Sequence, residues 1–144
     1  MGNHDLGHHG LDRASTGEPV RVLIVDDHPV FAQALRALLE DQDEILVVGT
    51  AGTAIEALEL AASSDADVVL MDHGLPGMDG IEATRRLRAS QPWTRVVLVS
   101  GRAHEVGHEA REAGAMAVLH KGNLHAEVAE IVLEVASLPP GVLL

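Results

Sequence analysis

The residues in this chain that could do chemistry mostly come directly after short apolar runs. Asp26 and Asp27 stand side by side after "VLIV", Asp72 follows "VVLM", Ser100 follows "VVLV", and the single lysine, Lys121, follows "AVLH". Two carboxylates some 5 Å apart repel each other by roughly 3 kcal/mol at an effective dielectric constant of about 20. A cation must offset that repulsion, and the elements around these residues should show where it binds.

The apolar runs have the length and composition of buried strands, and they alternate with segments of helical periodicity. We expect strands at residues 20–26, 44–50, 67–71, 95–100 and 115–120. Pro29 suits the first turn of a helix, and Thr53 with Glu56 and Asp79 with Glu82 have the spacing of helix N-caps. A weak helix is expected at about 104–113, and a final helix at about 124–136.

The inward faces of three helices follow from the spacing of their apolar residues. In the first helix these are Phe31, Leu35, Leu38 and Leu39; in the second, Ile55, Leu58 and Ala62; and in the last, Leu124, Val128, Ile131, Val132 and Val135.

This alternation predicts an α/β protein with a parallel sheet covered by helices on both faces. The expected architecture is a flavodoxin-like (βα)5 doubly wound sheet with strand order 2-1-3-4-5. Residues 20–137 would form the domain. Residues 1–19 are expected to be a disordered leader, and residues 138–144 a tail or the start of a linker.

In that topology the acidic residues meet. Ligands of open α/β sheets bind beyond the carboxyl ends of the strands, where the strand order reverses, here between the first and third strands. The first strand ends at Asp26 and Asp27, the third ends at Asp72, and Ser100 and Lys121 follow the fourth and fifth. Mg²⁺ prefers oxygen ligands of this kind. The sequence therefore predicts a Mg²⁺ site, with Mn²⁺ as a substitute.

Composition narrows the class of protein further. A net charge of −12 argues against a protein that binds a nucleic-acid backbone, and the absence of cysteine excludes disulfides and thiolate metal sites. No apolar run reaches the ~18 residues of a membrane span, and the first residues do not have the pattern of a signal peptide. We expect a cytoplasmic protein that binds neither membranes nor, directly, nucleic acid.

The same residues carry a resemblance to a family. From Val20 to about Ala136 the chain resembles the receiver domain of response regulators, the phospho-accepting part of two-component signalling. The matching stretches are "VDDHP" and "MDHGLPGMDG", with Pro76 and Gly80 at the usual offsets, followed by Ser100 and Lys121. The stretches "DDHPVF" and "GIEATRRLR" are closest to the NarL/FixJ subfamily.

The resemblance implies roles for these residues. Asp72 would take a phosphoryl group from a sensor histidine kinase, assisted by Lys121, and Ser100 would later donate its hydroxyl to a phosphoryl oxygen. Asp27, Asp72 and the backbone carbonyl of Gly74 would bind the metal directly, and Asp26 through a water. The domain would promote only its own phosphorylation and dephosphorylation. Phosphorylation would alter an output surface, and the resemblance implies homodimerisation and a role in transcription regulation.

The chain departs from the family in three ways. Val118 stands where a switch aromatic is usual, three residues before Lys121. Gly74 and Arg102 occupy the two positions that commonly tune dephosphorylation. Subfamily members usually continue into a helix-turn-helix domain that binds DNA, whereas this chain ends without one, so we expect either an excised or a stand-alone receiver.

Two other classes of protein share part of the pattern. "HEVGH" (His104 to His108) matches the H-E-x-x-H motif of zinc proteases, with Glu105 as base and Glu127 as an imaginable third ligand, although Gly107 weakens the helix that this motif needs. A haloacid-dehalogenase-like Mg²⁺-dependent phosphatase would also use a strand-end aspartate as nucleophile. Its nucleophile, however, normally lies in a D-x-D motif on the first strand.

Overall fold

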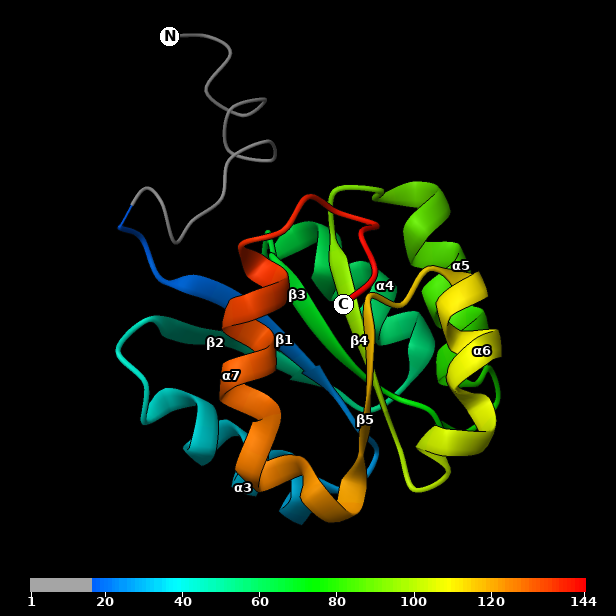
Figure 1. The fold of residues 1–144 in the computed structure, drawn as a ribbon, viewed down its shortest axis with the longest axis horizontal. Coiled ribbons are helices and arrows are strands. Elements are labelled where there is room, and N and C mark those ends of the chain that lie inside the picture. The colour runs from blue at the N-terminus through cyan, green and yellow to red at the C-terminus, as the bar shows by residue number, and fades with distance from the viewer. Residues whose placement is uncertain (1–16) are drawn as a thin grey trace, which may run out of the picture.

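The computed structural model describes residues 17–144, which form a single parallel sheet with helices on both faces (Figure 1). The sheet has five strands in the order β2-β1-β3-β4-β5, which confirms the predicted fold class. Their bounds are β1 (Val20–Val25), β2 (Ile45–Ala51), β3 (Val68–Asp72), β4 (Arg95–Ser100) and β5 (Ala117–His120). The expected leader lies almost entirely outside the described residues.

The helices divide into two layers. On one face of the sheet lie α3 (Pro29–Glu40) and α7 (Leu124–Ala136), and on the other lie α4 (Ala54–Ser63), α5 (Gly80–Ser90) and α6 (Ala103–Ala113) (Figure 1). A short 3-10 helix, η1 (Lys121–Asn123), joins β5 to α7. No helix within residues 17–144 is long and apolar enough to cross a membrane.

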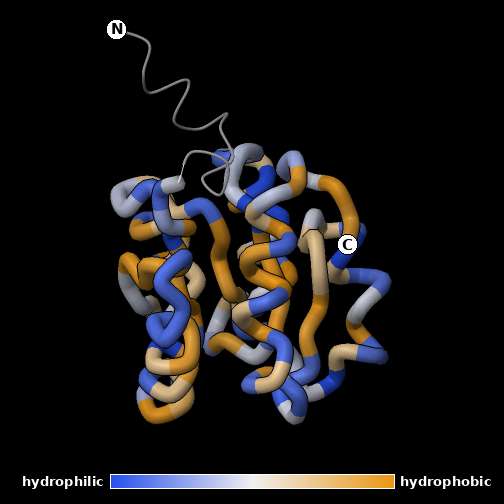
Figure 2. The backbone as a smooth tube through the Cα atoms, turned by 60° about the vertical axis from the view of Figure 1, so that its left-hand side comes forward, coloured by the Kyte–Doolittle hydropathy of each residue, from blue (hydrophilic) through white to orange (hydrophobic). Residues whose placement is uncertain are grey.

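Alternation along the strands separates two cores. In β1, Val22 and Ile24 pack against α3 and α7, whereas Leu23 and Val25 pack against the layer of α4, α5 and α6. The inner strands β1, β3 and β4 are buried almost throughout, which is why they are mostly apolar, as the orange tube in Figure 2 shows, whereas the edge strand β2 exposes Leu46 and Thr50. The rigid sheet fixes the positions of the residues at its carboxyl edge.

The predicted helix caps are confirmed. The side chain of Thr53 accepts a hydrogen bond from the backbone N–H of Glu56 (3.2 Å), and Asp79 accepts one from that of Glu82 (2.9 Å). The Glu56 carboxylate in turn accepts a hydrogen bond from the N–H of Gly52 (2.8 Å). These contacts satisfy backbone donors that the first turn of a helix leaves without partners.

Two predicted inward faces were partly wrong. In α4, Ile55 is 57% exposed and Ala62 is also exposed, while the buried residues are alanines, Ala54, Ala57 and Ala61. In α3, Leu38 is exposed. The sheet-facing side of α4 is therefore rotated toward small residues, because their size lets the helix lie close to the strands.

The strand register brings the functional residues to the same edge of the sheet. Val25 of β1 pairs with Met71 of β3, Asp72 with Val99 of β4, and Ser100 with His120 of β5. The residues that follow Val25, Met71, Val99 and His120 therefore lie along one edge of the sheet.

Gly80 holds the loop after β3 close to this edge. A Cβ atom on Gly80 would collide with the backbone carbonyl oxygen of Asp72, so no larger residue fits. The N–H of Gly80 donates to the carbonyl of His73 (3.0 Å), and the N–H of His73 donates to that of Val99 (2.9 Å). The backbone around Asp72 is thus fixed on both sides.

Candidate metal centre

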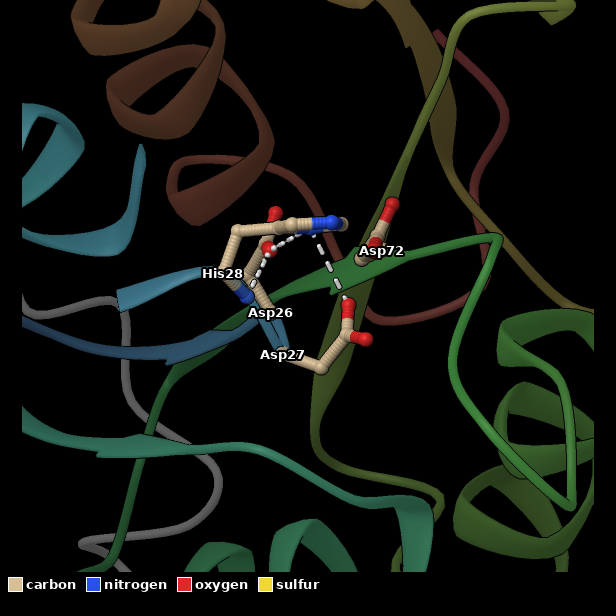
Figure 3. Close-up of side chains that lie close together, drawn as sticks. All are labelled: Asp26, Asp27, His28 and Asp72. Carbon is tan, nitrogen blue, oxygen red and sulfur yellow. Dashed lines mark hydrogen bonds and ion pairs between the residues drawn. The ribbon is translucent and has the colours of Figure 1, made fainter. Parts of the chain in front are cut away.

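Three carboxylates and an imidazole meet at the carboxyl edge of β1 and β3. Asp26, Asp27, His28 and Asp72 each place one potential ligand atom within 4.8 Å of the others (Figure 3). Asp26 and Asp72 are buried, with side chains only 3% exposed, and Asp27 lies at the rim with 31% exposure. The sequence prediction that these three aspartates share one crevice is consistent with this arrangement.

Lys121 reaches into the same cluster from the start of η1, directly after β5. Its Nζ lies 3.0 Å from Oδ1 of Asp72 and 3.7 Å from Oδ2 of Asp26. Partial burial by itself would lower the pKa of Lys121, but the hydrogen bond and charge of Asp72, together with the charge of Asp26, raise it above its ordinary value of 10.5. The ammonium is therefore charged at physiological pH.

The aromatic ring of Phe31 also contacts this lysine. The Nζ of Lys121 lies 5.1 Å from the centre of the ring, within the range of a cation–π interaction. Phe31 comes from the first turn of α3. It helps to hold the ammonium over the carboxylates.

The residues fit a divalent cation by charge and by an unsatisfied oxygen. The three carboxylates and one ammonium of the cluster carry a net charge of −2 when ionised, which a divalent cation would balance. Oδ2 of Asp72 is buried and has no hydrogen-bond partner among the described residues. A buried carboxylate oxygen normally has a partner, and the oxygen donors around it are those that Mg²⁺ prefers.

Ser100 lies at the same edge but faces His73. Its Oγ accepts a hydrogen bond from the backbone N–H of Arg102 (2.9 Å) and lies 3.3 Å from Nδ1 of His73. Ser100 is 2% exposed, whereas Arg102 and Gly74 are exposed. The expected donation from Ser100 to a phosphoryl oxygen would require this hydroxyl to leave its His73 contact.

Sequence reasoning missed the contributions of His28, His73 and Phe31. His28 follows Asp27 directly, and His73 follows Asp72 directly. That adjacency was the available signal, but it does not tell which way an imidazole points. The contact between Phe31 and Lys121 joins residues that are 90 positions apart, so no local sequence pattern predicts it.

The H-E-x-x-H segment does not form a comparable site. His104 and His108 are exposed on α6; His108 lies near Glu112, and Glu105 pairs with Arg102. The only group of three or more potential ligands within residues 17–144 is the one around Asp26 and Asp72. The zinc-protease interpretation of this motif therefore has no support.

Comparison with known proteins identifies the family. Residues 22–133 match the family model of the response regulator receiver domain. The chain is 36% identical over 122 residues to the transcriptional regulatory protein NarL of Mycobacterium tuberculosis, covering 83% of this chain and 56% of that protein. The signal receiver domain of NarL from that species superposes with a TM-score of 0.78 at 35% identity, covering 83% of this chain and 97% of that one.

Two further similarities show the range of the relatives. A protein-glutamate methylesterase/protein-glutamine glutaminase of Myxococcus xanthus is 40% identical over 114 residues, which cover 76% of this chain and 32% of that protein. The CheX-CheY-BeF3-Mg+2 complex from Borrelia burgdorferi contains a chain that matches at 26% identity and a TM-score of 0.77, covering 89% of this chain and 96% of that one.

The chain spans about half or less of the length of these curated relatives, and the region that it shares with them is the receiver. The haloacid-dehalogenase and zinc-protease alternatives find no support in these matches. The match over residues 22–133, the strand order and the identity to NarL agree, and the chain belongs to the response regulator receiver domain family.

Proposed function

We propose that Asp72 of this receiver domain accepts a phosphoryl group from a sensor histidine kinase in the cytoplasm. One observation carries the proposal. The buried carboxylate of Asp72 has one oxygen held by Lys121 at 3.0 Å and a second oxygen without a partner among the described residues, next to two more aspartates. A carboxylate in this position can act as a nucleophile toward phosphorus.

Asp72 and Lys121 would have separate roles in the phosphoryl transfer. An oxygen of Asp72 attacks the phosphorus of a phosphohistidine or a small acyl phosphate, the P–N or P–O bond of the donor breaks, and an acyl phosphate forms on Asp72. Lys121 stabilises the negative charge on the phosphoryl oxygens, since its ammonium already lies beside the nucleophile.

Asp27, Asp72 and the carbonyl of Gly74 would hold Mg²⁺ or Mn²⁺, with Asp26 acting through a water. When bound, the cation neutralises phosphoryl charge. A chain similar to this one belongs to a complex that is described as CheX-CheY-BeF3-Mg+2, and that description supports a receiver that takes a cation together with a phosphoryl-like group.

Phosphorylation would change an output surface formed by α6, β5 and α7. Ser100 and Lys121 lie at the carboxyl ends of the strands that flank α6, so movement at either residue is transmitted to that helix. We propose that this face pairs with a second copy of the domain after phosphorylation. Contact with DNA would belong to another domain of a longer regulator, as in transcriptional relatives.

The test is phosphorylation by acetyl phosphate with Mg²⁺, followed by intact mass measurement. The wild-type domain should gain one phosphoryl group, and Asp72→Asn should gain none. Asp79→Asn is the matched control, since asparagine keeps the cap of α5. A phosphoryl group that still adds to Asp72→Asn would overturn the proposal.

A further inference from the structure

The imidazole of His28 lies among the carboxylates of the candidate metal centre. Its Nδ1 is 3.1 Å from Oδ1 of Asp26 and 3.1 Å from Oδ1 of Asp27, and Figure 3 shows the ring extending over both toward Asp72. The His28 side chain is 67% exposed, so packing does not hold it there. Its position follows from the two carboxylates and from its own backbone.

The backbone of His28 is fixed by its neighbours. Its N–H donates to Oδ1 of Asp26 (2.8 Å), which closes a tight turn between the two residues. Pro29 follows directly and restricts His28 to the extended conformation that it has, with φ −104° and ψ 101°. The ring is thus attached to a segment that loses little freedom when Nδ1 takes a ligand position.

The distance from Nδ1 to Asp27 matches that between neighbouring ligand atoms of one ion. With metal–ligand bonds of about 2.1 Å, adjacent corners of an octahedron lie about 3.0 Å apart. The 3.1 Å separation between Nδ1 and Oδ1 of Asp27, the aspartate that would bind the cation directly, is close to that edge length. Oδ1 of Asp26, also 3.1 Å from Nδ1, lies within hydrogen-bond distance of the ring.

A second observation, independent of the histidine, points to a ligand in the same place. Oδ2 of Asp72 is buried, belongs to a side chain that is 3% exposed, and has no hydrogen-bond partner within residues 17–144. The cluster therefore offers one nitrogen and three carboxylates, one of them with an oxygen that a cation would satisfy.

We propose that Nδ1 of His28 is an additional ligand of this metal centre, and that it makes the centre favour first-row transition-metal ions over Mg²⁺. This inference rests on the metal site of the proposed function. Imidazole binds Ni²⁺ and Zn²⁺ well, whereas Mg²⁺ takes oxygen ligands. Removing the nitrogen should therefore weaken transition-metal binding selectively.

Pulsed electron paramagnetic resonance of bound Mn²⁺ tests the nitrogen contact directly. The full chain is used with His4, His8 and His9 replaced by glutamine, so that the leader cannot supply an imidazole. In this background the spectrum should show coupling to a ¹⁴N nucleus, which His28→Gln removes. His73→Gln, which takes away the other imidazole beside Asp72, should keep the coupling.

Calorimetric titration with Ni²⁺ and Mg²⁺ gives the second readout. His28→Gln should weaken Ni²⁺ binding about tenfold and leave Mg²⁺ binding within about twofold. The inference is overturned if the spectrum has no ¹⁴N coupling while Asp27→Ala abolishes Mn²⁺ binding, a result that leaves the proposed metal site intact. If Asp27→Ala does not change Mn²⁺ binding, the metal site itself is wrong.

Discussion

The hydroxyl of Ser100 lies 3.3 Å from Nδ1 of His73, the residue directly after Asp72. Oγ also accepts a hydrogen bond from the backbone N–H of Arg102, so the Ser100 hydroxyl is held between that residue and the imidazole. Ser100 thus contacts the loop of the phospho-acceptor before any phosphoryl group is present. This contact is a direct side-chain link between the end of β4 and the Asp72 loop.

Removing the His73 ring should favour the state in which the Ser100 hydroxyl contacts a bound phosphoryl group. In His73→Val the Ser100 hydroxyl has no imidazole to leave, so beryllofluoride with Mg²⁺ should bind more tightly than to the wild-type domain. Titration calorimetry measures the change. The gain should vanish in a Ser100→Ala background, because the two side chains act through one contact. Equal gains in both backgrounds would show that Ser100 plays no part.

The domain should lose stability at alkaline pH, because Lys121 loses its charge there. The folded state raises its pKa, so the stabilisation is complete below the ordinary value of 10.5 and is lost as pH rises through the higher folded value. The chain has no tyrosine or cysteine and no other lysine, so no other side chain titrates there. Urea unfolding between pH 9 and 12 should show the decline.

Lys121→Met is the control for that decline. Without the ammonium the free energy of unfolding should depend much less on pH above 9. A decline of the same size in this variant would assign the effect to another group.

Asp27→Ala should stabilise the domain in the absence of metal. It removes a negative charge beside Asp26 and Asp72, and a gain of about 0.5–1 kcal/mol would raise the melting temperature by about 2–4 °C. Added Mg²⁺ should then stabilise the variant less than the wild type, since ligand binding to the folded state is lost. Thermal unfolding with and without Mg²⁺ measures both effects, and equal stabilisation by Mg²⁺ would contradict the role of Asp27.

Gly80→Ala should be strongly destabilising, because the new methyl group would meet the carbonyl oxygen of Asp72. We expect a loss of about 2–3 kcal/mol in the free energy of unfolding. Gly101→Ala is the control, since a Cβ there has no neighbour within 4 Å. Chemical denaturation of both variants would test the difference, and equal losses would mean that the close approach of Gly80 is not what matters.

The sequence was sufficient for the fold because the inner strands are buried almost throughout and the first three helices begin with Pro29 or with the capping residues Thr53 and Asp79. The sequence also predicted that Asp26, Asp72 and Lys121 lie at one edge of the sheet, because the carboxyl ends of parallel strands lie together. The inward face of α4 was predicted wrongly because Ile55 is larger than Ala54 and dominated the pattern, although it is exposed in the structure.

Side-chain direction was beyond the reach of sequence patterns. The positions of the His28 and His73 rings depend on which hydrogen bonds they make, and the Phe31–Lys121 contact depends on how α3 packs beside β5. These features modify a metal or phosphoryl site whose main residues can be predicted from strand ends alone.

The most direct test of the central claim is to locate the phosphoryl group itself. After treatment with acetyl phosphate and Mg²⁺, borohydride reduces an aspartyl phosphate to homoserine, and tandem mass spectrometry of the peptides identifies the converted position. We predict homoserine at position 72. Homoserine at another aspartate, or an acid-labile phosphoryl group on His73 with Asp72 unchanged, would contradict the account.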